Sequence, residues 1–199
     1  MAVDADKIVI GTARIYYANV GEAFPANTVL AGAAWGGDWE ELGETTKPLT
    51  QTIALKTLEI MSDQSMGAVK RVITDRSVSF ETELIEFDAT RFALVTGGTK
   101  TTPTAAGTGT KGVDKVTIGS APCLDEFAFG FEMAYTISDC ADTLWIRGVI
   151  PRGTAAKDVK FDYGRKSNTG VPISFEGLVD TSKAVAEQFF EMRIQTKAL

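Results

Sequence analysis

Two tryptophans and an acidic cluster form the most chemically versatile group of side chains in this 199-residue chain. Trp35 and Trp39 flank a Gly-Gly-Asp turn, and Glu40, Glu41 and Glu44 follow directly. Indole rings beside carboxylates could stack on a sugar, whereas three carboxylates could bind calcium. The D-x-D-x-D-G spacing of a calcium loop is absent, which favours a solvated acidic rim. Packing of one or both tryptophans in the core or at a subunit contact is the favoured interpretation, and a carbohydrate-binding β-sandwich stands as the alternative.

Enzymatic chemistry has little support in the composition. The chain has no histidine, which excludes Ser-His-Asp catalysis, histidine-ligated metals and histidine proton shuttles. Asp139 and Asp142 flank Cys140, but no base or basic activator accompanies the thiol, so a turn is expected there. Cys123 and Cys140 allow either one disulfide or two free thiols. We predict that the protein is not an enzyme and has no cofactor, no metal site and no catalytic residues.

Alternation of apolar and polar residues predicts most of the elements that position these side chains. It is clearest in SVSFETELIEF from Ser77, FAFGFEMAYT from Phe127, VPISFEGLV from Val171 and FFEMRIQT from Phe189. Weaker strand signals lie at 12–18, 116–118 and 143–149, and the last contains Trp145, expected in the core or an interface. Strands with one apolar face belong to antiparallel sheets. We predict a single mainly-β domain over 1–199, a sandwich or barrel of antiparallel strands.

One short helix and one loop interrupt the β pattern. In FDATRFALVTGG, Asp88 suits the N-cap, Phe87 and Phe92 occupy hydrophobic staple positions, and Gly97 suits the C′ position. These signals predict a flanking α-helix at about 88–97. The low-complexity segment 97–112, GGTKTTPTAAGTGTKG, is predicted to be a flexible loop. A phosphate-binding role is disfavoured, because a helix and not a strand precedes the segment.

Segment 45–74 carries apolar residues on both faces of its expected strands. Leu49, Ile53 and Leu55 share one parity, whereas Leu58 and Ile60 share the other. This pattern suits an extended arm whose faces meet different neighbours, since unpaired edges would otherwise promote aggregation. We therefore predict an inter-subunit arm at about 45–74, with contacts from Leu49, Ile53, Leu55, Leu58, Ile60, Met66, Val69 and Val72.

The polar faces of the confident strands combine small residues with carboxylates. A smooth acidic face repels a polyanion, so it would suit an enclosed surface along which a polyanion slides. Ordinary solubilising surface is the competing interpretation. The net charge of −6 also disfavours general binding of nucleic-acid phosphates. The candidate residues for such a face are Ser79, Glu81, Glu83, Glu132 and Glu176.

Several soft motifs follow one another in a familiar order. Paired tyrosines, Tyr16 and Tyr17, precede a turn rich in alanine and glycine, and W-x-x-L-G-x-T follows at 39–45. Next come a Ser-Asp-Gln step at 62–64 and the run ITDRSVSFETELIEFDATRFALVTGG, with its TELIE strand and short helix. In this order the chain resembles the tail tube (major tail) proteins of long-tailed bacteriophages, most closely from Ala33 to Gly98.

The resemblance implies a structural virion protein with a fold related to type VI secretion tube proteins. Six such subunits form a ring, the rings stack into a tube, and their inner sheets join in a barrel that conducts DNA into the host cell. The implied partners are further copies of the chain, the tape measure, the tail terminator and baseplate or tail-tip proteins. DNA would pass through the lumen without specific binding. Another assembling virion or secretion-tube protein of the same fold is the nearest alternative.

The resemblance also gives meaning to particular residues. Trp35, Trp39 and Leu42 would form the root of the arm, and the acidic strand faces become candidates for the lumen wall. The implied location is the phage tail, assembled in the host cytoplasm. No membrane anchoring is expected, because the sequence contains no run of about 20 apolar residues.

Overall fold

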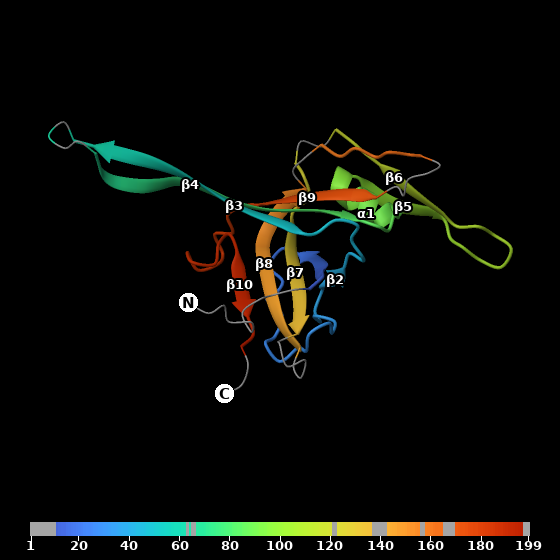
Figure 1. Cartoon of the computed structure of the whole chain (residues 1–199). Helices are drawn as coiled ribbons and strands as arrows, with labels where there is room; N and C mark the ends of the chain where they lie inside the picture. The colour runs from blue at the N-terminus through green and yellow to red at the C-terminus, as the bar shows by residue number, and fades with distance from the viewer. Residues whose placement is uncertain are drawn as a thin grey trace.

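A computed structural model shows ten strands and one helix among the residues that it describes (Figure 1). The model describes residues 11–62, 64, 67–120, 123–136, 143–155, 158–164 and 170–196. The elements are β1 (Ala13–Asn19), β2 (Glu40–Glu41), β3 (Thr50–Met61), β4 (Ala68–Leu84), α1 (Ala89–Thr96), β5 (Thr99–Thr104), β6 (Val113–Thr117), β7 (Phe127–Thr136), β8 (Thr143–Ala155), β9 (Val171–Gly177) and β10 (Glu191–Ile194). The mainly-β prediction with one short helix is confirmed.

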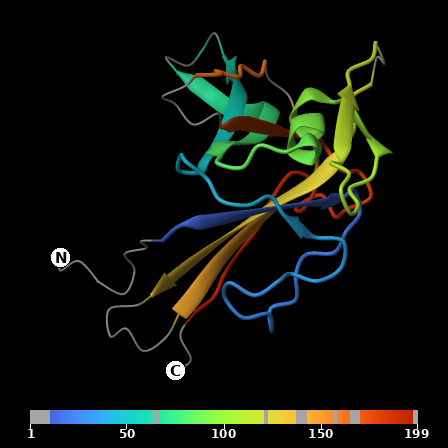
Figure 2. The ribbon, with the colours of Figure 1, turned by 90° about the vertical axis from the view of Figure 1, so that its right-hand side faces the viewer.

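Eight of these strands form one antiparallel sheet in the order β2-β1-β7-β8-β9-β4-β3, with β10 also paired to β8. Strand β8 connects two layers. Most of its length pairs with β7 and β10, whereas its end, Gly153–Ala155, pairs with β9. Figures 1 and 2 show β3, β4 and β9 in one layer and β1, β7, β8 and β10 in the other.

The main core fills the space between the two layers. Phe80 of β4 meets Phe131 of β7 edge to face at 5.3 Å, and Phe129 of β7 stacks on Phe175 of β9 at 4.0 Å. Val78 on β4 lies in the same core, on the same strand face as Phe80. The period-two pattern of β4 therefore predicted its buried face correctly, since alternate side chains of a strand point to opposite faces.

The predicted helix forms as α1. The Asp88 side chain accepts a hydrogen bond from Arg91 N at 2.7 Å, and Gly97 adopts the left-handed conformation at φ 63°. Phe87 and Phe92 lie 5.8 Å apart, as a hydrophobic staple requires. The expected loop at 97–112 is wrong in part, because Thr99–Thr104 forms strand β5 and pairs with β6 in a two-stranded sheet.

The expected arm forms a long β-hairpin that projects from the body (Figure 1). Its distal strands, from Ile53 to Met61 and from Ala68 to Ile73, are exposed along their length. Leu49 differs from the other predicted arm residues, because it packs partly buried against the core of its own subunit. Met66 lies outside the described residues.

The face of β7 that points away from the main core is buried and not solvated as the sequence pattern indicated. Glu132 is only 1% exposed, so its prediction as a residue of a solvated polar face is wrong, and Ala128 on the same face is fully buried. The physical reason is a cover of tryptophans from the loop between β1 and β2, which buries Ala128 in a second apolar cluster. Strand β7 is therefore covered on both faces.

Candidate assembly surfaces

The tryptophans of the β1–β2 loop pack against the outer face of the β1–β7–β8 layer. Trp35 stacks on Tyr16 with ring centroids 4.2 Å apart, and Trp39 meets Trp35 edge to face at 5.1 Å. The Trp35 ring lies so close to Gly130 that a Cβ on the glycine would be 2.6 Å from it. The two indole side chains are 4% and 8% exposed, so they cannot serve as an open platform for a sugar.

A buried ion pair fixes this loop to the sheet. Arg147 Nε donates to Glu132 Oε2 at 2.7 Å, and neither side chain is more than 1% exposed. Glu132 also accepts hydrogen bonds from the Trp35 indole at 3.1 Å and from Gly32 N at 2.5 Å. Burial of a charge is tolerated only where such partners satisfy it. Glu132 is thus a structural residue of the monomer.

The guanidinium of Arg147 also has hydrogen-bond partners outside the ion pair. Its guanidinium donates to the carbonyls of Ala26, Val29 and Leu30 at 2.9–3.2 Å and lies 4.1 Å from the centroid of the buried Trp145 ring. These bonds hold the loop backbone at three points. The sequence pattern missed this role, although Glu132 and Arg147 are directly opposed in the register of β7 and β8.

The segment leading into the arm is held by helix α1. Leu42 is buried in the main core, and Arg91 Nε donates to its carbonyl at 2.6 Å. Arg91 also pairs with Glu86 at 2.7 Å and with Asp88. Trp35 and Trp39 belong to the separate cluster outside the β1–β7–β8 layer. Of the three predicted root residues, Leu42 is therefore the one directly attached to the helix.

Tyr17 gives this region a titratable group. Its hydroxyl donates to Glu40 Oε2 at 2.6 Å. Burial, reinforced by the neighbouring Glu40 carboxylate, raises the pKa of Tyr17 to about 12. The neutral phenol is the form that this contact favours, because ionisation would place two negative charges side by side.

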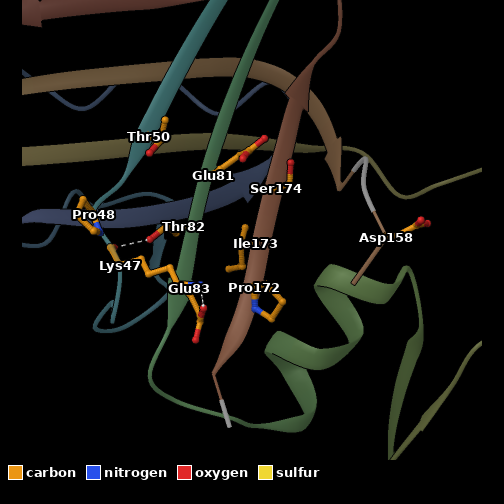
Figure 3. A pocket seen from close by; sticks show the side chains of 10 residues that line it. All are labelled: Lys47, Pro48, Thr50, Glu81, Thr82, Glu83, Asp158, Pro172, Ile173 and Ser174. Atoms are coloured by element: carbon orange, nitrogen blue, oxygen red, sulfur yellow. Dashed lines mark hydrogen bonds and ion pairs between the residues drawn. The ribbon is translucent and has the colours of Figure 1, made fainter. Parts of the chain in front are cut away.

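The outer face of β3, β4 and β9 brings most of the candidate acidic residues together. Ser79 is opposite Glu176, and Glu81 is opposite Ser174. Glu83 forms an ion pair with Lys47 at 2.5 Å. The face carries an open groove of about 440 Å³ (Figure 3), lined by Lys47, Pro48, Thr50, Glu81, Thr82, Glu83, Asp158, Pro172, Ile173 and Ser174. Glu132 lies in the other layer and does not belong to this set.

The arm presents apolar side chains on both of its faces. Leu55 is opposite Arg76, and Ile53 is opposite Val78, whose side chain points into the core. Farther out, Leu58 pairs with Val72 on the opposite face of the hairpin. The apolar side chains thus move from one face of the hairpin to the other, and they do so at a register shift between Lys56 and Thr57. Large apolar side chains on the arm are 39–70% exposed: Ile53, Leu55, Leu58, Ile60, Met61, Val69, Val72 and Ile73.

Several chemical functions find no support in the part of the chain that the structure describes. No group of three or more potential metal-binding side chains occurs among the described residues. Within those same ranges, no helix is long and apolar enough to cross a membrane. Cys123 is an exposed free thiol, whereas Asp139, Cys140 and Asp142 lie outside the described residues.

A mainly-β subunit with an exposed arm that is apolar on both faces is of the class of proteins suited to assemble through their surfaces. The family model for phage tail tube proteins matches residues 1–194, and the chain belongs to that family. It is therefore a non-enzymatic, structural component of the phage tail. A comparison with curated proteins found no match.

Proposed function

We propose that the subunit assembles into hexameric rings that stack into the tail tube, which conducts DNA into the host cell. The observation that carries this proposal is the exposed arm, whose two faces both hold apolar side chains. Contiguous exposed apolar surface of this kind marks an interaction site. An arm apolar on one face could rest on one partner, whereas two apolar faces require protein on both sides.

We assign the lumen wall to the outer face of β3, β4 and β9. Small residues such as Ser79 and Ser174 alternate there with Glu81 and Glu176. An acidic face of this kind repels DNA phosphates, so the duplex slides without adhering. Glu83 forms an ion pair with Lys47 at the margin of this face. Glu132 is excluded from this wall, because it is buried beneath the β1–β2 loop.

The dimensions of such a wall are consistent with a DNA conduit. Strands β3, β4 and β9, with the end of β8, would supply four strands per subunit, and six subunits would supply 24. At a strand spacing of about 4.8 Å and a tilt of about 40°, the barrel would be roughly 45–50 Å across its backbone. That width admits a duplex with side chains lining the wall.

Ring closure would also protect the open end of the sheet. Strand β3 is the last strand in the sheet order, so its outer edge is available to another chain. Such an edge is an aggregation hazard unless it is covered or closed into a barrel. A head-to-tail interface that closes on itself gives a ring and removes the free edge.

The remaining partners act at the ends and inside the tube. We assign these roles to the tail terminator, the baseplate or tail-tip proteins and the tape measure, with assembly in the host cytoplasm. Family membership supports this assignment. DNA is a passing cargo without specific contacts, since the proposed wall is acidic.

Electron microscopy of the purified protein tests the proposal. We expect long hollow tubes in negative stain at high protein concentration. A matched variant replaces Lys56–Asp75 by Asn-Gly, so that Leu55 and Arg76 flank a two-residue hairpin turn. This shortened protein should fold and remain monomeric. Discrete rings or monomers from the full chain under all conditions would contradict tube formation, and tubes from the shortened chain would contradict the role of the arm.

A further inference from the structure

Strand β4 contains one residue more than β3 in the middle of the arm. Lys56 pairs with Asp75, whereas the next residue, Thr57, pairs with Ile73. Thr74 therefore has no partner on β3. Two residues of one strand that oppose one residue of the other form a β-bulge, and we call this feature the Thr74 bulge.

The Thr74 bulge decides which side chains meet in the distal arm. Val72 and Val78 are six positions apart, so a regular strand would place them on the same face. Instead, Val78 lies in the core, whereas Val72 lies opposite Leu58 on the other face of the hairpin. The same register brings Glu59 and Arg71 into an ion pair at 2.6 Å. A regular continuation of the pairing would have placed Glu59 opposite Val72.

Two local contacts hold the bulge. The Thr74 hydroxyl donates to the Lys56 carbonyl at 3.2 Å, and Lys56 Nζ pairs with Asp75 Oδ2 at 2.8 Å. Residues 52–61 and 68–76 are all exposed, so no packing on the body of the subunit imposes a direction on this part of the hairpin. The bend therefore originates in the hairpin itself.

A change in this bend would displace the tip of the arm. A bulge bends its strand and increases the local twist, and Figure 1 shows the hairpin twisting as it leaves the body. At about 3.4 Å per residue, residues 57–61 extend roughly 17 Å past the bulge, so a change of about 10° moves the tip by about 3 Å. Apolar side chains are in contact only within about 4.5 Å. A displacement of this size is thus enough to break contacts made by exposed residues such as Ile60.

We propose that Thr74 is a positioning residue of assembly, whose bulge sets the direction of the distal arm and thereby the rotation between successive rings of the tube. Bulges are used in this way elsewhere, to re-aim side chains at functional positions. Lys56 and Asp75 hold the bend from within the hairpin. The inference rests on the proposed tube, because a rotation is defined only between stacked rings.

Deletion of Thr74 tests this role in the assembled protein. The pairs on both sides of the bulge, such as Lys56 with Asp75 and Thr57 with Ile73, can persist, and their side chains keep their faces. The deletion therefore removes the bend and leaves the apolar surfaces in place. Thr74→Ser keeps the extra residue and its hydroxyl donor, so it is the matched control. Helical reconstruction from electron micrographs should show a changed rotation between rings for the deletion and the wild-type rotation for Thr74→Ser.

A distance measurement tests the direction of the arm in the single subunit, below the concentration at which tubes form. Spin labels are attached to Met61→Cys on the arm and to Val185→Cys or Ile118→Cys on the body, all at exposed positions. The background carries Cys123→Ser and Cys140→Ser, and circular dichroism verifies folding. Met61 lies on β3, whose length the deletion does not change. Two body positions are used, because a bend perpendicular to one label-to-label vector can still change the other.

The two measurements together decide the proposal. Relative to Thr74→Ser, the deletion should shift at least one of the two distances by roughly 3 Å. Such a shift supports the proposal whether the deletion variant forms tubes of altered rotation or forms none, since its arm then points away from its partner. Unchanged distances, or tubes of wild-type rotation, would overturn it and leave the tube standing. Failure of the wild-type protein to form tubes would overturn both proposals.

Discussion

Neutralising Glu132 would remove one charge of the buried ion pair with Arg147. The Glu132→Gln variant keeps the shape of the side chain and replaces one carboxylate oxygen by an amide group. Glu132 Oε1 accepts from Gly32 N, whereas Oε2 accepts from both Trp35 and Arg147. In either amide orientation, at least one of these three donors therefore meets an NH₂ group and loses its acceptor.

The expected loss of stability is about 3–5 kcal/mol, since the change leaves the fully buried Arg147 without its counter-charge. A loss of this size is a large part of the roughly 5–15 kcal/mol that typically separates the folded and unfolded states. For a chain of this length it corresponds to a fall in Tm of roughly 6–20 °C. The Glu132→Gln variant should consequently be folded and markedly less stable.

Urea denaturation followed by tryptophan emission measures this effect. The free energy of unfolding is obtained by linear extrapolation, and emission reports solvent access to the three tryptophans, Trp35, Trp39 and Trp145, all of which are buried in the folded state. Glu126→Gln is the matched control, because Glu126 forms an ion pair with Arg152 in which each side chain is 35% exposed. That control should change the free energy of unfolding little, because solvent screens an ion pair at the surface. Equal losses in the two variants would refute the idea that the buried pair holds the β1–β2 loop.

Three further predictions concern packing, titration and the lumen wall. Gly130→Ala should cost about 1–3 kcal/mol of unfolding free energy in urea denaturation, because its Cβ would overlap the Trp35 ring. Tyr17 has a folded-state pKa of about 12, above its unfolded value of about 10, so its contact with Glu40 stabilises the fold below pH 10 and is lost as the pH rises towards 12. Because Tyr17→Phe removes the phenol that ionises, it should abolish the share of the fall in Tm between pH 9 and 12 that Tyr17 causes. Glu81→Lys should permit tube assembly and slow genome ejection from phage particles, through attraction to phosphate.

Each of these predictions has a control in the same chain. Gly119→Ala should be nearly neutral, since no heavy atom lies within 4 Å of a Cβ built there, and equal losses at both glycines would contradict the packing argument. Tyr163→Phe alters an exposed tyrosine and should leave the alkaline fall in Tm unchanged. Glu81→Gln is the control for Glu81→Lys, because it removes the negative charge of the side chain without reversing it. Normal ejection with Glu81→Lys would remove Glu81 from the lumen wall.

The sequence predicted best those features that depend on local pattern. Alternation placed Val78 and Phe80 on the buried face of β4, because a strand with one covered side must alternate. The helix was equally predictable, since its N-cap Asp88 and its C-terminal Gly97 act within a few residues of the chain. Local rules of this kind require no knowledge of which segments meet in space.

The sequence failed where burial depends on a distant segment. Alternation correctly placed Glu132 on the face of β7 opposite the main core. It could not show that residues 20–39 cover that face. The cover depends on bonds between residues about 100 positions apart, such as Trp35 with Glu132. A pattern over adjacent residues contains no information about such pairs. The strand at Thr99–Thr104 was missed for a related reason, because its threonine-rich composition resembles a loop and its pairing with β6 is tertiary.

The register of the arm adds a constraint that the sequence pattern alone did not supply. Thr52 and Ser79 are opposed on the polar face assigned to the lumen, and the same face continues outward to Leu58 and Val72. Aliphatic side chains are poorly suited to line an aqueous channel, because their burial from water is favourable. If the body of the hairpin faces the lumen, then its distal half must leave the wall and be covered by protein. The register shift after Lys56 marks where that change begins.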